Sequence, residues 1–225
     1  MSARYDLVLL DLDGTLADSA PGILASVRHA YAALGVATPA EPELRGFVGP
    51  PLAESFATHG VPPDLVADAV AAYREVYGAG NLFDDAVFPG VPGCLAAVRA
   101  AGSRLAVATS KPEPTARRVV EHLGLHEHLD RGLDDVFGAT FDGARSTKGD
   151  VVAHALASLD AAALSRAGRV VMVGDRERDV LGAAVHGVAC VGVAWGYARP
   201  GELAAAGAAA VVGTPAGLTA ALVGE

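Results

Sequence analysis

The feature that most constrains the fold is an apolar run, 7–10, that leads directly into two acids, Asp11 and Asp13. A short run of leucine and valine is typical of a strand buried on both faces of a parallel sheet. The acids then follow its carboxyl end, where open α/β sheets bind their ligands. Side chains alternate along an extended backbone, so both carboxylates point to the same side, and Gly14 lets the chain turn away. Because two uncompensated carboxylates repel each other, the pattern indicates a bound metal ion or a phosphoryl chemistry that uses both.

Further runs along the chain predict the rest of the sheet. Four more strand-like runs are short and apolar: 105–108, 170–173, 188–193 and 209–212. Between them apolar residues recur at helical spacing, as they do from Val151 to Leu159. Strands that alternate with helices predict a parallel sheet covered on both sides. The expected fold class is therefore α/β, with a doubly wound parallel sheet.

The interval 17–86 breaks this alternation. It contains three helix-like stretches and no convincing strand, and prolines and glycines such as those at 49–51 separate the stretches. A second segment rich in proline and glycine, 89–93, marks the return to the alternating pattern. We therefore expect a small α-helical cap domain, 17–86, inserted into an α/β core domain formed by 1–16 and 87–225.

Composition excludes several classes of protein. Although 52% of the 225 residues are hydrophobic, the excess is mostly alanine, and no window offers the roughly 20 apolar residues that span a membrane. A net charge of −9 argues against a partner that is a nucleic-acid polymer. The first ten residues show no secretory signal, so we expect a cytoplasmic protein, either a monomer or a homodimer. Cys94 and Cys190 lie in apolar contexts and are predicted to be buried thiols, with a disulfide as the minor alternative.

Chemical groups gather at three of the predicted strand ends and at one helix start. They are Asp11 and Asp13, then Thr109 and Ser110, then Asp175 and Asp179, with Lys148 from the helix. In a doubly wound sheet such ends converge on one crevice. A carboxylate there can attack phosphorus, while a hydroxyl, backbone amides and a lysine hold the other phosphoryl oxygens. Oxygen ligands from Asp11 and Asp175 suit Mg²⁺, and Asp13 can protonate the leaving oxygen and later activate water.

The basic residues are unusually distributed. Of the 17 only two are lysines, Lys111 and Lys148, and both are expected in loops beside the crevice. We expect Lys148 to bind phosphate and Lys111 to support the site, for instance by holding its loop. Thr109 and Ser110 could also cap the following helix, which is compatible with binding phosphate.

These motifs resemble those of the haloacid dehalogenase superfamily, in order and across nearly the whole chain. The matching motifs are DLDGT at 11–15, Thr109-Ser110, Lys148 and GDRERD at 174–179. The second aspartate, two residues after the first, is a feature in which the chain resembles the phosphatase and mutase branch of the superfamily. The chain also resembles the phosphoglycolate phosphatase-like and 5′-nucleotidase-like subgroup in the position of its helical insert. Further matches to this subgroup include GPPL at 49–52 and ATSKP at 108–112.

The resemblance implies a role for each matching residue. Asp11 would be the nucleophile and a metal ligand, and Asp13 the general acid and base, with its backbone carbonyl also on the metal. Thr109, the amide of Ser110 and Lys148 would bind phosphate. Asp175 would ligate Mg²⁺ directly, and Asp179 directly or through water. Within the cap, Arg45, Gly49 and Pro50 would contact the part of the substrate away from phosphorus, with a plain surface turn as the equal alternative.

Arg176 departs from the wider superfamily, which has a small hydroxyl residue after the first acid of this motif. It would either add a cation near the site or form an outward salt bridge.

The favoured function is Mg²⁺-dependent hydrolysis of a small phosphate monoester, a 5′-nucleotide or phosphoglycolate, through an aspartyl-phosphate. One alternative is a phosphomutase of the β-phosphoglucomutase type, which passes the same phosphoryl group to a sugar hydroxyl. Another is a non-catalytic phospho-binding regulator, which an intact set of acids disfavours. The sequence does not name the substrate, because no motif fixes the contacts made by the cap.

Overall fold

A computed structural model describes residues 2–166 and 169–224. The chain divides into two compact units. The core unit joins the segment that ends at Ala17 to the segment that begins at Val87, and the helical unit is Asp18–Ala86. Where the chain passes between the units, β2 (Ala17–Asp18) and β3 (Ala86–Val87) pair as a short two-stranded sheet.

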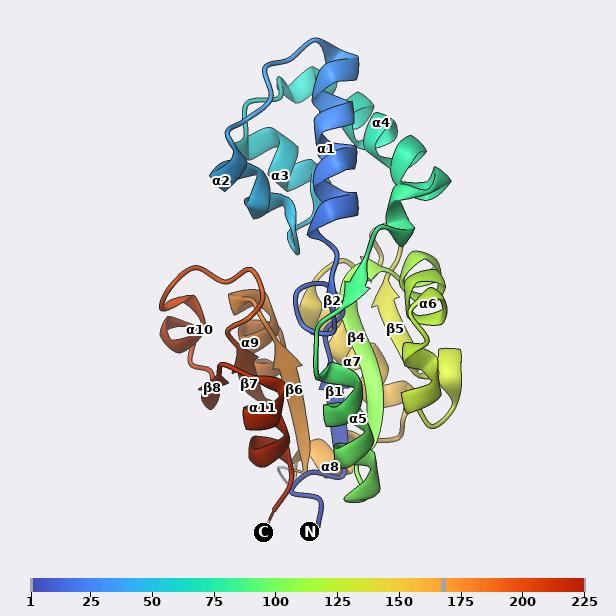
Figure 1. The fold of residues 1–225 in the computed structure, drawn as a ribbon, viewed down its shortest axis with the longest axis vertical. Coiled ribbons are helices and arrows are strands. Elements are labelled where there is room, and N and C mark those ends of the chain that lie inside the picture. The colour runs from blue at the N-terminus through green and yellow to red at the C-terminus, as the bar shows by residue number, and fades with distance from the viewer. Residues whose placement is uncertain (1, 167–168, 225) are drawn as a thin grey trace. The chain divides into compact units, whose positions relative to one another are not determined.

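A six-stranded parallel sheet forms the centre of the core unit (Figure 1). Its strands are β1 (Leu7–Leu10), β4 (Arg104–Pro112), β5 (Val136–Ala139), β6 (Val170–Gly174), β7 (Ala189–Val193) and β8 (Ala210–Val212). Their order in the sheet is β5-β4-β1-β6-β7-β8. Strand β1 is therefore central, with β4 and β5 on one side of it and β6, β7 and β8 on the other. All four residues of β1 are buried, as expected for a strand with neighbours on both sides. The predicted fold class is confirmed.

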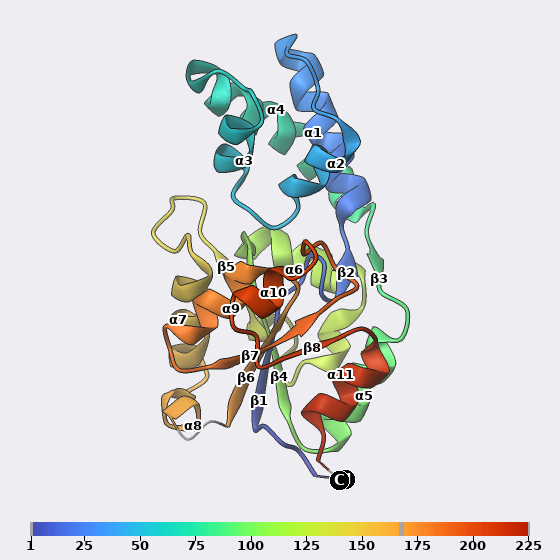
Figure 2. The ribbon, with the colours of Figure 1, turned by 90° about the vertical axis from the view of Figure 1, so that its left-hand side faces the viewer.

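Helices cover both faces of this sheet (Figure 2). On one face α7 (Lys148–Ser158) packs against α9 (Glu177–Ala184), with the short α8 (Ala162–Arg166) beside them. On the other, α5 (Val91–Ala100) packs against α11 (Pro215–Leu222). The remaining helices are α6 (Glu113–His122), α10 (Glu202–Ala205) and two 3-10 turns, Leu125–His128 and Gly132–Asp135.

The alternation of side chains between the two faces of β1 explains which helices lie near Asp11. Leu7 and Leu9 belong to the apolar cluster that includes residues of α7 and α9. Side chains two residues apart share a face, so continuing the chain by two residues brings Asp11 toward the same pair of helices. The two helices that border this side of β1 therefore supply the partners of Asp11.

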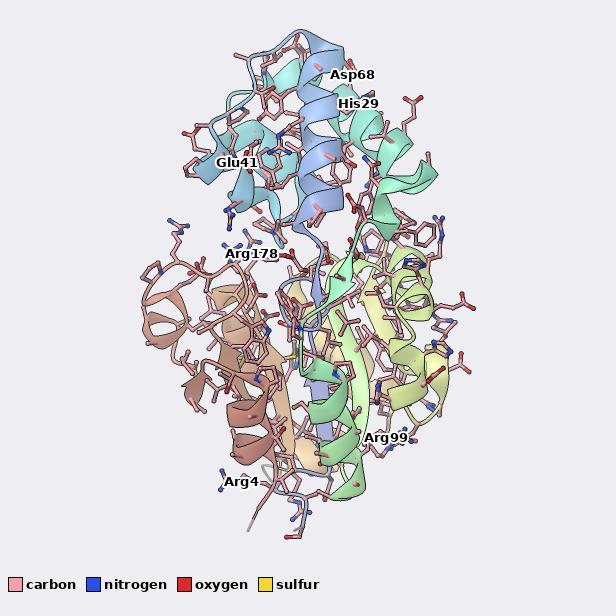
Figure 3. All side chains as sticks on the ribbon, viewed as in Figure 1. Arg4, His29, Glu41, Asp68, Arg99 and Arg178 are labelled. Atoms are coloured by element: carbon pink, nitrogen blue, oxygen red, sulfur yellow. The ribbon has the colours of Figure 1, made fainter. Side chains whose placement is uncertain are left out.

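The helical unit packs α1 (Ala20–Leu34) against α4 (Val66–Ala79), with α2 (Glu41–Leu44), α3 (Leu52–Thr58) and three 3-10 turns, Arg45–Phe47, Pro63–Leu65 and Asn81–Phe83. Its apolar centre holds three aromatic rings, Tyr31, Phe47 and Phe56, and the centroids of the two phenylalanine rings are 5.1 Å apart. His29, Glu41 and Asp68 are exposed on its surface (Figure 3). A buried aromatic centre gives this unit a core of its own.

The structure corrects several expectations about the elements. Strand β5 was missed, because its sequence VFGA is only four residues long and contains glycine. The interval 17–86 contains strand residues only at its two ends, in β2 and β3. The second predicted strand extends through Thr109, Ser110 and Lys111 to Pro112, so these residues are part of β4 rather than a loop.

The capping role considered for Thr109 and Ser110 is wrong, because the residue before α6 is Pro112. Both cysteines are buried and free, which confirms the prediction of thiols. Among the described residues, none of the helices has the length and apolar character needed to cross a bilayer.

Candidate active site

The site is centred on the carboxylate of Asp11, which follows β1. Lys148, the first residue of α7, places its ammonium 2.8 Å from Asp11 Oδ1 and donates to the backbone oxygen of Ala108 at 3.0 Å. Helix α7 begins there because the Thr147 hydroxyl accepts a hydrogen bond from the Asp150 amide at 3.1 Å, and the Asp150 carboxylate accepts from the Thr147 amide. The sequence TKGD thus fixes both the start of the helix and the position of its lysine.

Asp179 brings a second carboxylate to the same lysine. Its Oδ1 lies 2.8 Å from Lys148 Nζ, and its Oδ2 accepts from the Arg176 amide at 3.0 Å, in the first turn of α9. Gly174 is required here, since a Cβ on it would lie 2.2 Å from the carboxyl carbon of Asp179. Lys148 therefore bridges Asp11 and Asp179 across the two helices that face β1.

Asp175 completes the group of acids and is fully buried. Its Oδ2 accepts from the Tyr197 amide at 2.7 Å, whereas its Oδ1 is buried without a hydrogen-bond partner among the described residues. Gly14 and Gly196 make room for it, because a Cβ on either would lie within 2.4 Å of Asp175 Oδ2. A buried carboxylate oxygen without a hydrogen-bond donor needs a bound ligand to compensate for the hydration that it has lost.

The carboxylates of Asp11, Asp175 and Asp179 fit a metal ion. Each offers an oxygen within 4.8 Å of the others. Burial, and then the neighbouring acids, raise the pKa of Asp175 well above its ordinary value, and burial raises the pKa of Asp11 to about 6. Burial alone would lower the pKa of Lys148, but the carboxylates of Asp11 and Asp179 outweigh it and raise this pKa overall. With one ammonium among three buried acids, a hard divalent cation is the ligand that matches the donor set and its charge.

Asp13 has a different partner from the other acids. Lys111 of β4 places its ammonium 2.9 Å from Asp13 Oδ1, and both side chains are nearly buried. The carboxylate of Asp13 is not part of the three-carboxylate group. The role predicted for its backbone carbonyl on the metal stays a prediction.

Thr109 and Ser110 lie in the last part of β4, where the pairing with β5 becomes irregular. Thr109 is buried, and its hydroxyl accepts from the Lys111 amide at 3.3 Å. Ser110 is half-buried. The structure thus brings the ends of β1, β4 and β6 and the start of α7 together, as the sequence predicted for these strand ends.

Two further ion pairs support the site, and the sequence did not predict the partners in either pair. Arg176 pairs with Glu202 of α10 at 2.8 Å in a nearly buried salt bridge, and its charge also acts on Asp175, against the larger effect of burial, to lower the pKa of that carboxyl, so it is also a cation near the site. Arg145 donates to Glu113 at 2.8 Å and to the Gly138 oxygen at 2.6 Å, which ties the segment before Lys148 to the start of α6. Opposite charges 26 or 32 residues apart carry no local signal of pairing, so the sequence could not indicate either contact.

Arg45, Gly49 and Pro50, predicted to be substrate contacts, all belong to the helical unit. Arg45 is exposed and begins a 3-10 turn, and the buried Phe47 and Val48 anchor the segment to the unit's core. Gly49 has a φ of +103°, which a side chain would strain. The sequence and the local backbone therefore present a fixed turn with an arginine beside it, and the recognition role stays a prediction.

Comparison with known proteins identifies relatives over most of the chain. Residues 8–193 match the family described as haloacid dehalogenase-like hydrolase. The tyrosine-protein kinase PtkA of Mycobacterium tuberculosis is 46% identical over 86% of this chain, but this chain spans only 63% of that protein. A 5′-nucleotidase of Pseudomonas aeruginosa is 40% identical, over 90% of this chain and 88% of its own length.

A solved structure of a predicted phosphatase from Clostridium acetobutylicum has the same fold. It superposes with a TM-score of 0.87, at 35% identity, and the match covers 96% of each chain. The match along the sequence, the shared fold and the converging acids agree with one another, and the similar proteins include several that are named as phosphatases. The chain belongs to the haloacid dehalogenase-like hydrolase family.

Proposed function

We propose that this protein is a Mg²⁺-dependent phosphatase that hydrolyses small phosphate monoesters in two steps, with Asp11 as the nucleophile. The observation that carries the proposal is the setting of Asp11: its carboxylate follows the central strand, contacts the ammonium of Lys148 at 2.8 Å and lies beside Asp175 and Asp179. Such a carboxylate can be held ionised for attack only where cations offset its burial.

In the first step a carboxylate oxygen of Asp11 attacks phosphorus, and the bond from phosphorus to the ester oxygen breaks. The Asp13 carboxyl gives its proton to the departing alcohol. The Lys148 ammonium, the Thr109 hydroxyl and the Ser110 amide hold the phosphoryl oxygens, whose charge grows in the transition state. The product of this step is an aspartyl-phosphate on Asp11.

In the second step water attacks the same phosphorus and releases Asp11 and inorganic phosphate. Asp13, now a carboxylate, accepts the proton from this water, which restores the starting state. Mg²⁺, held by Asp11, Asp175 and Asp179, would offset the charge of the acids and of the phosphoryl group, which both carry negative charge. The Asp175 Oδ1 atom, which has no hydrogen-bond partner in the described part of the chain, supports this part of the proposal.

For the substrate we propose a 5′-nucleotide first and phosphoglycolate second. The 40% identity to a 5′-nucleotidase over 90% of the chain supports the first choice. Arg45, Gly49 and Pro50 of the helical unit would recognise the part of the substrate away from phosphorus, and Arg45 has the charge to bind a second anionic group. We also propose that the protein acts in the cytoplasm, as a monomer or homodimer, on small molecules rather than on a nucleic-acid polymer.

A second candidate is transfer of the phosphoryl group from Asp11 to a hydroxyl other than water. The 46% identity to a protein named as a tyrosine kinase favours this candidate, with a tyrosine side chain as acceptor. A sugar hydroxyl, as in a phosphomutase, is the other acceptor of this class. Both share the first step and differ only in what attacks the aspartyl-phosphate.

One experiment tests the proposal and separates these candidates. A panel of phosphate esters is incubated with Mg²⁺, and phosphate release is measured as kcat/KM for each ester. Hydrolysis is expected for the nucleotide or phosphoglycolate, and its loss in Asp11→Asn with an unchanged circular dichroism spectrum supports the nucleophile. Turnover by that variant at the wild-type rate contradicts the assignment. Phosphorylated tyrosine or sugar without release of phosphate favours the second candidate.

A further inference from the structure

Lys111 was expected only to support the site, and the structure gives it a specific partner among the acids. Its ammonium lies 2.9 Å from Asp13 Oδ1, and the two side chains are 5% and 11% exposed. Its backbone amide donates to the Thr109 hydroxyl at 3.3 Å. One residue near the end of β4 therefore contacts both the acid proposed to move the proton and the hydroxyl proposed to hold the phosphoryl group.

The two lysines of the chain divide the two acids of the first motif between them. Lys148 contacts Asp11, and Lys111 contacts Asp13, whereas all fifteen other basic residues are arginines. An arginine guanidinium tends to bind both oxygens of a carboxylate at once, but an ammonium is a compact charge that can contact a single oxygen. Lys111 makes its contact with Asp13 at the Oδ1 oxygen.

We propose that Lys111 is a positioning residue for proton transfer: it fixes the carboxylate of Asp13 relative to the end of β4, where the phosphoryl group is bound. This inference rests on the proposed function. The proton itself passes from the Asp13 carboxyl to the ester oxygen as the phosphorus–oxygen bond breaks, and the attacking water later returns a proton to Asp13. Lys111 neither gives nor takes a proton in either step.

A role in proton transfer can be separated from a role in binding phosphate by the leaving group. Departure of 4-nitrophenolate needs little help from an acid, whereas departure of the alkoxide of a nucleotide or another alkyl ester depends on it. kcat/KM reports the steps up to the first irreversible one, which is expected to be attack by Asp11. Lys111→Met removes the ammonium but keeps a similar side-chain volume, and Arg104→Met, which removes a half-exposed cation from the same strand, is the matched control.

We expect Lys111→Met to lower kcat/KM for the best alkyl ester by about 10-fold or more, and for 4-nitrophenyl phosphate by less than about 3-fold. Arg104→Met should leave both values unchanged, and Lys111→Arg should restore part of the loss. Adding Lys111→Met to Asp13→Asn should have no further effect on either ester, because the carboxylate that it positions is already gone.

Four outcomes overturn the inference. An equal fall for both esters, with a raised KM, assigns Lys111 to phosphate binding instead. Additive losses in the double variant show that Lys111 acts independently of Asp13. If the wild type and Asp13→Asn behave as proposed but Lys111→Met equals the wild type, the inference fails while the proposed function stands. If the wild type hydrolyses none of the esters, both fail together.

Discussion

Arg176 and Glu202 are ion-paired at 2.8 Å, and their side chains are only 13% and 6% exposed. The Glu202 oxygen that contacts Arg176 also accepts a hydrogen bond from the Glu177 amide at 3.0 Å. The other carboxylate oxygen of Glu202 accepts one from the Arg199 amide at 3.0 Å. Arg176 lies directly after Asp175, and Glu177 begins α9, which carries Asp179. Glu202 therefore holds the segment that positions two of the three clustered acids.

Replacing Glu202 by alanine should destabilise the protein by about 2 to 4 kcal/mol, because it removes the carboxylate that pairs with the nearly buried Arg176 guanidinium and the acceptor of two backbone amides. Urea unfolding followed by circular dichroism measures the change. The matched control is Glu41→Ala in the helical unit, whose ion pair with Arg28 is about half exposed and should cost less than about 1 kcal/mol. A similar small effect for both variants would show that Glu202 contributes no more than a surface acid.

The same residue predicts a dependence of stability on pH. Burial alone would raise the pKa of Glu202, but the Arg176 guanidinium and the two amide contacts, from Arg199 and Glu177, outweigh it and hold the pKa below the ordinary 4.5. A depressed pKa means that the stabilisation is fully present above the unfolded value and is lost as the pH falls through the folded value. The difference in unfolding free energy between wild type and Glu202→Gln should therefore be largest at pH 6 to 7 and shrink below about pH 4.5. A difference that stays constant down to pH 3 contradicts this account.

How far the sequence predicts the structure depends on whether a contact has a local signal. Asp11 and Asp175 were assigned to one site because each directly follows an apolar strand, and parallel strands bring their carboxyl ends to one edge. Strand β5 has no comparable signal, since four residues with an internal glycine show neither length nor alternation. Thr109 was placed outside its strand because polar residues usually mark a strand end, although β4 continues past it to Pro112.

The partners of the acids were harder to predict than the acids. The scarcity of lysine drew attention to Lys111 and Lys148, and the helix start and the superfamily motif also indicated Lys148, but nothing in the sequence indicated which aspartate each lysine would contact. Glu202 looks like any acid in the first turn of a helix, a position that the helix dipole favours. Its pairing depends on how α10 packs near α9, which is a property of the folded core and not of either segment.

Metal binding should raise the stability of the protein. Asp11, Asp175 and Asp179 are buried with one lysine among them, so a divalent cation that binds the folded state relieves their repulsion. Adding millimolar Mg²⁺ to protein treated with EDTA should raise Tm by a few degrees, and Asp175→Asn should abolish most of the shift. An equal shift in the wild type and in Asp175→Asn would place the ion elsewhere.

The loop after β7 should control how well the metal binds. A Cβ on Gly196 would lie 2.4 Å from Asp175 Oδ2 and from the Gly14 oxygen, so Gly196→Ala must displace one of them. We expect the Kd for Mg²⁺ to rise by about 10-fold or more, measured by calorimetry, because ligand residues lose affinity when the groups that orient them move. Gly78→Ala is the control, since a Cβ there meets nothing within 4 Å and should leave the Kd unchanged. An unchanged Kd in Gly196→Ala would show that the loop adapts without moving Asp175.

Substrate recognition by the helical unit can be tested at Arg45. This side chain is exposed, and among the described residues it has no ion-pair partner, so removing it should not disturb the fold of the unit. If it binds a group of the substrate away from phosphorus, Arg45→Ala should raise KM for the best nucleotide or for phosphoglycolate by about 10-fold, since a charge-assisted hydrogen bond contributes roughly 1.5 kcal/mol. The kinetic constants for 4-nitrophenyl phosphate, which lacks such a group, should not change. Arg28→Ala is the matched control, because Arg28 is an arginine of the same unit that is already paired with Glu41. Equal effects of both variants on every ester would mean that the arginine acts only through the charge of the unit and recognises no particular substrate.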